Sequence, residues 1–202
     1  MRIRTRLLIA SYLVNCMNNK EALNKLLEGN KRYMSGKLGE KDVGSAREAT
    51  KNGQHPIVTL LTCSDSRVPP ELIFDANVGE IFVIRNAGNV VEEVVLGSIE
   101  YGVEHLHTPI LLVLGHEKCG AVTAACQGGE CPPNIAVIMK KIKCCAKKHN
   151  NDVEKTVNEH VRCMIEKIRE NSEIVTKLEK EGKLKIVGMK YHFEDGRVEK
   201  VE

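Results

Sequence analysis

Two short stretches of this chain carry side chains that bind metals and move protons. Residues 63–67 read Cys-Ser-Asp-Ser-Arg and follow the apolar run 57–62, and residues 116–119 read His-Glu-Lys-Cys and follow the apolar run 110–115. Short apolar runs that are rich in β-branched residues predict buried strands. Two strand ends therefore supply Cys63, His116 and Cys119. Two thiolates and one imidazole are a ligand set that Zn²⁺ takes in catalytic sites with an open fourth position.

Asp65 and Arg67 lie beside the first of these cysteines. A carboxylate and a guanidinium two residues apart can form a structural ion pair. In a loop they can also form a bidentate pair that aims one carboxylate oxygen at water on a metal. The neighbouring thiols and imidazole favour the second interpretation.

The elements that position these groups alternate between strand and helix. Apolar runs predict strands at 57–62, 81–84, 110–114 and 184–189, and helical periodicity predicts helices at about 18–36, 46–51, 90–107, 134–148, 153–170 and 172–181, with shorter ones opening near 69 and 119. The turn signal Asp195-Gly196 predicts a terminal hairpin. We expect a single α/β domain with a mainly parallel sheet flanked by helices and a C-terminal antiparallel edge hairpin. In such sheets, sites form beyond the carboxyl ends of the strands.

The predicted helix over 90–107 carries its apolar residues on one stripe that includes Val91, Val94 and Ile99. Ser98 and Gly102 lie on the same stripe. Because their side chains are small, we expect a neighbouring element to approach the helix closely there.

Composition excludes several classes of function. The chain has 202 residues, of which 42% are apolar and 28% charged, and this is typical of one soluble globular domain. Its net charge of +3 comes from interleaved basic and acidic residues, and only 3% of residues are aromatic. Neither a basic patch nor a base-stacking platform is indicated, so we expect no nucleic-acid partner.

Eight cysteines could indicate a disulfide framework, but a chain of this size and apolar content does not need one. We expect reduced thiols and therefore a cytoplasmic location. None of the cysteines outside the predicted site has a Cys-x-x-Cys partner, so we interpret them as small apolar residues without a second metal. The histidines other than His116 are interpreted as mostly solvated or capping residues: His55, His105, His107, His149, His160 and His192.

The first residues differ from the rest. Residues 1–17 form an N-terminal arm or a targeting-like segment, because Arg2, Arg4 and Arg6 precede a short apolar run over 7–14. No small-x-small cleavage site follows, and the run is too short to span a bilayer. An export signal therefore stays open as an alternative. We expect residues 18–202 to form the α/β domain that carries the predicted zinc-dependent catalytic site.

Four motifs together resemble the β-class carbonic anhydrases. They are the Cys-Ser-Asp-Ser-Arg stretch, Arg-Asn-Ala-Gly-Asn at 85–89, Gly-Ser-Ile-Glu-Tyr at 97–101 and Gly-His-Glu-Lys-Cys-Gly at 115–120, in that order. The resemblance runs from about Lys20 to the terminal hairpin. It implies a lyase that hydrates CO₂ reversibly to bicarbonate and a proton through zinc-bound hydroxide.

The resemblance also assigns residues to roles. It implies one zinc per chain on Cys63, His116 and Cys119, with Asp65 and Arg67 as the catalytic pair. It further implies a homodimer, or a higher oligomer built from dimers, whose interface holds the active cleft. Residues that match the lining of that cleft are Gln54, Phe82, Ala87, Tyr101 and the backbone of Gly120.

Two other functions use the same features. Relatives with this fold hydrolyse CS₂ or COS, which are linear like CO₂, and the ligand set alone does not separate these substrates. A non-catalytic zinc-binding protein is the other alternative. We expect such a protein to lack the Asp-Arg pair, which this chain retains.

Overall fold

The computed structural model describes residues 17–201. Residues 1–16 of the segment 1–17, which we interpreted as an arm or targeting segment, lie outside the described residues. No helix within the described part of the chain is long and apolar enough to cross a membrane.

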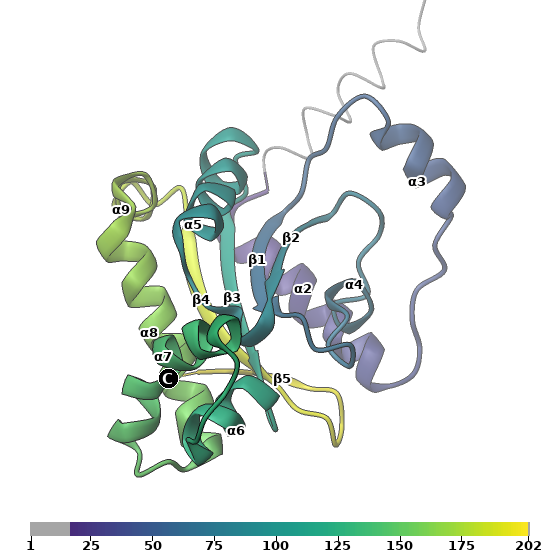
Figure 1. Cartoon of the computed structure of the whole chain (residues 1–202). Helices are drawn as coiled ribbons and strands as arrows, with labels where there is room; N and C mark the ends of the chain where they lie inside the picture. Colours follow the sequence, from purple (N-terminus) through teal and green to yellow (C-terminus); the bar gives the residue numbers. More distant parts are fainter. Residues whose placement is uncertain (1–16, 202) are drawn as a thin grey trace, which may run out of the picture.

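Five strands form one sheet in the order β2-β1-β3-β4-β5 (Figure 1). β1 pairs in parallel with β2 and β3, β3 pairs in parallel with β4, and β4 pairs with β5 antiparallel. This confirms the predicted parallel sheet with an antiparallel C-terminal edge. The strands are β1 (Val58–Cys63), β2 (Ile81–Asn86), β3 (Ile110–His116), β4 (Lys185–Tyr191) and β5 (Val198–Lys200).

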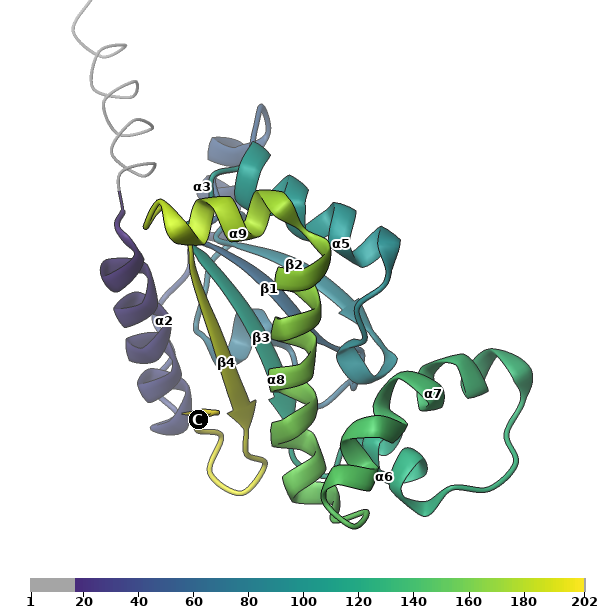
Figure 2. The same cartoon turned by 90° about the vertical axis from the view of Figure 1, so that its left-hand side faces the viewer.

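Helices cover both faces of the sheet (Figure 2). α2 lies on one face, and α5, α8 and α9 lie on the other. α6 and α7 extend beyond the carboxyl ends of the strands. The helical elements are α2 (Asn19–Met34), α3 (Val43–Thr50), α4 (Pro70–Ile73), η1 (Ala87–Asn89), α5 (Glu93–Glu100), η2 (Tyr101–His105), α6 (Gly120–Gln127), α7 (Pro133–Lys148), α8 (Val153–Asn171) and α9 (Glu173–Lys180).

The central strands are buried on both faces because successive side chains point to opposite sides of the sheet. On β3, Leu112 and Leu114 pack into the core beneath α2, whereas Leu111 and Val113 pack into the core beneath α8. Apolar residues at consecutive positions thus hold a helix layer on each side. This packing fixes where β1 and β3 end.

The helix predicted over 90–107 is shorter and is not uniform. α5 begins at Glu93 and continues as the π-helix η2 from Tyr101 to His105. The expectation that Val94 faces the core is wrong, since this side chain is 83% exposed. Val94 lies in the first turn of α5, and its side chain points away from the sheet. The residues that are buried instead are Ile99 in α5 and Val103 in η2.

Gly102 confirms the predicted close approach. A Cβ atom at this position would lie 2.1 Å from Thr59 Oγ1 and 3.1 Å from Phe82 Cδ1. η2 therefore rests directly on β1, and no larger side chain fits between them.

Asp75 ties the segment after α2 to the rest of the domain. Its carboxylate, 1% exposed, pairs with Arg32 at 2.5 Å and with Lys41, and it accepts a hydrogen bond from the Gly39 backbone. Burial alone would raise the pKa of Asp75, but these donors outweigh it and lower the pKa to about 2.

We predict that Gly102→Ala lowers the free energy of unfolding by about 1–3 kcal/mol, because the added methyl group overpacks the contact with Thr59. Urea denaturation measures this. Glu104→Ala, at an exposed position of the same π-helical turn, is the control and should change stability by less than about 0.5 kcal/mol. An unchanged Gly102→Ala variant would contradict the packing.

Asp75 predicts a dependence of stability on pH. Its folded pKa lies below the ordinary value, so its contribution is present above about pH 4 and is lost as the pH falls towards 2. Asp75→Asn should therefore be less stable than the wild type by about 2 kcal/mol at pH 7, and the difference should shrink below pH 4. Denaturation at several pH values tests this, with Glu48→Gln at an exposed pair as control. A difference that does not vary with pH would refute the assignment.

Candidate metal centre

The parallel pairing of β1 with β3 brings the three predicted ligands together. β1 ends at Cys63 and β3 ends at His116, and Cys119 is the residue that precedes α6. The two Sγ atoms and a ring nitrogen of His116 all lie within 4.8 Å of one another, and the three residues are buried. No other group of three or more His, Cys, Asp or Glu side chains within residues 17–201 is as close.

His116 is oriented for coordination by a hydrogen bond to its own loop. Its Nδ1 atom lies 2.9 Å from the Glu117 carbonyl oxygen and donates to it, which leaves the lone pair on Nε2. Nε2 is buried and has no hydrogen-bond partner within the described residues. A buried ring nitrogen without a partner is costly unless a cation occupies the position that it faces. The donor set therefore fits a zinc ion.

The two thiols form a coupled pair. The hydrogen bond from Cys119 to Cys63 lowers the pKa of Cys63 to about 4, and the same bond raises the pKa of Cys119. The backbone N–H of Gly88 also donates to Cys63 Sγ, at 3.3 Å. The protein groups alone thus stabilise one negative charge on the pair. A second thiolate requires the positive charge of a metal.

Asp65 and Arg67 form the bidentate pair that the sequence predicted. Arg67 donates from Nε to Oδ1 at 2.9 Å and from Nη2 to Oδ2 at 2.8 Å. These bonds lower the pKa of Asp65 to about 2, so the carboxylate is ionised at neutral pH. Oδ2 also lies 3.9 Å from His116 Nε2. The pair therefore presents a carboxylate oxygen at the edge of the metal-binding cluster.

Two residues that support this loop were not predicted as functional. Arg85, at the end of β2, donates to the Cys63 carbonyl at 3.0 Å and to the Asp65 carbonyl at 2.8 Å. It fixes the backbone on both sides of Ser64. The sequence signal was its place in the Arg-Asn-Ala-Gly-Asn motif, directly after the strand predicted over 81–84.

His160 corrects our interpretation of the remaining histidines. It is 1% exposed, not solvated, and its Nε2 donates to the Gly88 carbonyl at 2.7 Å. Burial lowers the pKa of His160, which keeps the ring neutral. Gly88 has φ of 73° and in turn contacts Cys63. His160 lies between Val157 and Val161 on the buried stripe of α8, and this periodicity was the signal that we missed.

The predicted lining residues divide into two groups. Ala87 and Gly120 are neighbours of Gly88 and Cys119, so they lie at the cluster. Phe82 pairs in register with Thr59, four residues before the end of β1, which places it about 13 Å from Cys63 along the sheet.

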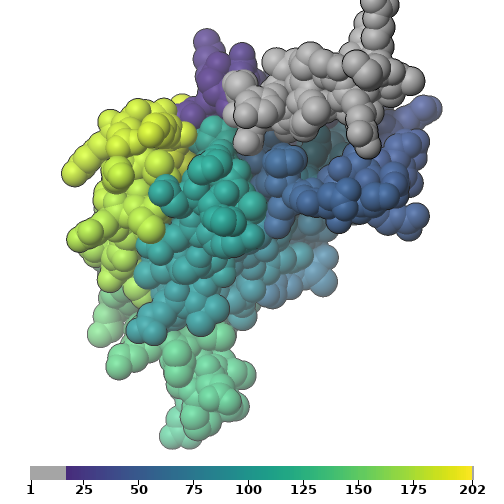
Figure 3. All heavy atoms as spheres, turned by 90° about the horizontal axis from the view of Figure 1, so that it is seen from above, coloured from purple at the N-terminus to yellow at the C-terminus, as the bar shows by residue number. Residues whose placement is uncertain are grey.

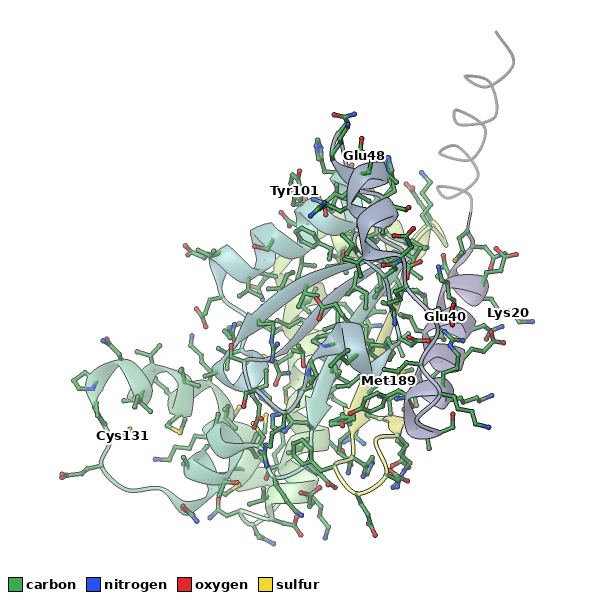
Figure 4. All side chains as sticks on the ribbon, turned by 90° about the vertical axis from the view of Figure 1, so that its right-hand side faces the viewer. Lys20, Glu40, Glu48, Tyr101, Cys131 and Met189 are labelled. Carbon is green, nitrogen blue, oxygen red and sulfur yellow. The ribbon has the colours of Figure 1, made fainter. Side chains whose placement is uncertain are left out.

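The other two lining residues lie with Phe82. The ring of Tyr101 is 5.8 Å from that of Phe82, and Tyr101 lines a surface pocket together with Gln54. Figure 4 shows Tyr101 at the end of the molecule opposite to the connection of α6 and α7, which carries Cys131. One chain therefore does not bring Gln54, Phe82 and Tyr101 to its own cluster.

The fold and this cluster match proteins of known function. A family model described as carbonic anhydrase matches residues 58–198. Similar curated proteins are the carbonic anhydrase of Mycolicibacterium smegmatis, 35% identical over 90% of this chain and 93% of its own, and carbonic anhydrase 2 of Mycobacterium tuberculosis, 33% identical over 89% and 91%.

Solved structures agree with the sequence matches. The β-carbonic anhydrase of Coccomyxa, solved with acetazolamide, has a TM-score of 0.72 and 27% identity over 87% of this chain and 84% of its own. A tetrameric β-carbonic anhydrase of Sordaria macrospora has a TM-score of 0.69 and 25% identity over 75% and 83%. The chain therefore belongs to the carbonic anhydrase family, in its β-class form, and is a lyase.

Proposed function

We propose that Cys63, His116 and Cys119 hold one zinc ion and that the site built around it hydrates CO₂ reversibly. The observation that carries this proposal is the buried Nε2 of His116, which lies beside two thiols and has no hydrogen-bond partner among residues 17–201. Zinc bound there supplies a Lewis acid that makes water a nucleophile near neutral pH. The protein keeps the site dry on one side, since Val90, Val122 and Ile142 pack around the cysteines.

The Asp-Arg pair orients the reacting groups. Asp65, ionised and held by Arg67, accepts hydrogen bonds only, so it orients a water molecule or a hydroxyl group by accepting a hydrogen bond from it. Arg67 fixes the direction of this acceptor with two parallel bonds. Arg85 donates hydrogen bonds to two backbone carbonyls of the same loop, and this fixes the position of the Asp65 carboxylate.

We further propose that a second copy of the chain completes the active cleft. Gln54, Phe82 and Tyr101 lie together near the amino ends of the strands. Figure 3 views the molecule from above, which is the side of the amino ends of the strands in Figure 1. β2 is an edge strand with half-buried side chains, and Val94 and Tyr101 nearby are exposed. An apolar edge of this kind favours burial against another chain. The solved relative from Sordaria macrospora is a tetramer.

The alternative functions have less support. The similar curated proteins are carbonic anhydrases, which favours CO₂ over CS₂ or COS as substrate. The retained Asp65–Arg67 pair argues against a non-catalytic zinc protein. We also propose a reducing, cytoplasmic location, which is supported by the seven cysteines between residues 17 and 201 being unpaired.

Metal analysis and CO₂ hydration test the site together. The wild type should contain about one zinc per chain, Cys63→Ser should lose it, and exposed Cys131→Ser should keep it. Asp65→Asn should keep the metal but lose about 100-fold or more in kcat, because it removes the charged acceptor. Stopped-flow hydration measures the rates.

A matched control exists for the aspartate. Asp195 and Arg197 have the same spacing and also share hydrogen bonds, but they are exposed in the terminal hairpin. Asp195→Asn should therefore hydrate CO₂ like the wild type. Zinc-loaded wild type without hydration activity would overturn the proposed function, and an active Asp65→Asn variant would overturn the role of the pair.

Mixed oligomers test the shared cleft. Cys63→Ser and Gln54→Ala chains should each have little activity alone. When the two are co-expressed, a mixed dimer combines an intact metal cluster from one chain with an intact Gln54 from the other. About a quarter of the sites should then be active, for random pairing of equal amounts. If each chain formed its whole site alone, mixing would restore nothing.

A further inference from the structure

The ring of Phe193 lies against two residues of the catalytic cluster. Its centroid is 4.1 Å from the central carbon of the Arg67 guanidinium. The ring also meets His116 edge-on, with centroids 5.6 Å apart and planes at 63°. Phe193 belongs to the connection between β4 and β5, far in sequence from both partners. The roles described so far for the metal ligands and for the Asp-Arg pair do not involve this aromatic ring.

Contacts that do not involve Arg67 hold Phe193 in place. The Phe193 N–H donates to Glu117 Oε1 at 2.7 Å, and the Glu117 N–H donates to the Tyr191 carbonyl at 3.1 Å. The ring also packs at 90° against that of Tyr191. Because these contacts join the hairpin to the loop after β3, removal of the Phe193 side chain leaves the main-chain anchor in place.

Stacking and hydrogen bonding use different parts of a guanidinium. Arg67 donates from Nε and Nη2 to Asp65, and its central carbon lies over the ring of Phe193, which does not compete for those hydrogen bonds. The Arg67 side chain is otherwise 52% exposed. Besides Asp65, the guanidinium contacts the Phe193 ring and, from Nη2 at 3.5 Å, the Lys118 carbonyl oxygen. Phe193 is the side chain among these two contacts that restricts movement of the guanidinium away from the carboxylate.

The orientation of Asp65 matters because a carboxylate is itself a zinc ligand. Asp65 Oδ2 lies 3.9 Å from His116 Nε2, the atom that faces the metal position. If Arg67 turns away, the freed carboxylate needs only a small movement to reach the same position. It would then exclude water and substrate.

We propose that Phe193 is a positioning residue that holds Arg67 in the plane of Asp65 and so keeps the fourth metal position open. The proposal rests on the proposed zinc site and its Asp-Arg pair. The contact in question is the one between Phe193, in the terminal hairpin, and Arg67.

Phe193→Leu tests the proposal, with Phe193→Met alongside as a second, unbranched apolar variant of similar volume. Both should bind zinc and fold, but kcat for CO₂ hydration should fall about five- to tenfold, the range of a partly desolvated cation–π contact. Phe193→Tyr, which keeps the ring, should restore the rate. Tyr33→Phe removes a hydroxyl that bonds Tyr191 behind the hairpin and should leave the rate unchanged.

A spectroscopic measurement separates this role from a merely structural one. With Co²⁺ in place of zinc, azide binding at the open position is followed by visible absorption. Phe193→Leu should weaken azide binding about five- to tenfold, because Asp65 competes for the metal. In an Asp65→Asn background the same substitution should have no effect, since no competing carboxylate remains.

The outcomes are distinct. Wild-type rates and azide affinity in both Phe193→Leu and Phe193→Met would overturn the proposal. So would equal weakening of azide binding in the Asp65→Asn background. A wild type that binds metal but does not hydrate CO₂ would instead refute the proposed function, and the azide titration would still decide the role of Phe193.

Discussion

The parallel pairing of β1 with β3 is the constraint on which the metal centre depends. Both strands are buried on two faces, so neither can slide without moving apolar side chains out of two cores. Their carboxyl ends are thereby fixed side by side, and Cys63 and His116 are the residues at those ends. Cys119 follows after a short turn. Long-range packing thus sets ligand positions that no local sequence preference could hold.

Electrostatics supports the proposal that this arrangement binds a cation. The cluster places a thiolate, a second thiol and an ionised Asp65 around one unpartnered imidazole nitrogen. Arg67 offsets the aspartate, and the Gly88 N–H offsets part of the charge on Cys63. The backbone N–H groups of Ala121 and Val122 lower the pKa of Cys119, but the bond to Cys63 and burial outweigh them and raise it. The protein therefore holds a site that is electrostatically incomplete without a metal.

The sequence predicted those parts that depend on neighbours in the chain. Strands and the Asp65–Arg67 pair are local features. The pair is found where expected, and the four predicted strands each end one or two residues later than predicted. The contacts that were missed join distant segments. His160 Nε2 donates to the carbonyl of Gly88, which is 72 residues away in the sequence. The ring of Phe193, near the end of the chain, contacts Arg67 in the loop after β1. Periodicity marks such residues as buried but does not say what they touch.

The position of Gln54 and Tyr101 at the amino ends of the strands has a kinetic consequence. If a cleft draws its two halves from different chains, turnover per chain depends on how much protein is present, by mass action. Dilution below the dissociation constant of the dimer would then abolish activity without unfolding the chain or releasing its metal. A newly made chain would then be a zinc-loaded precursor, and activity would begin only when it meets another.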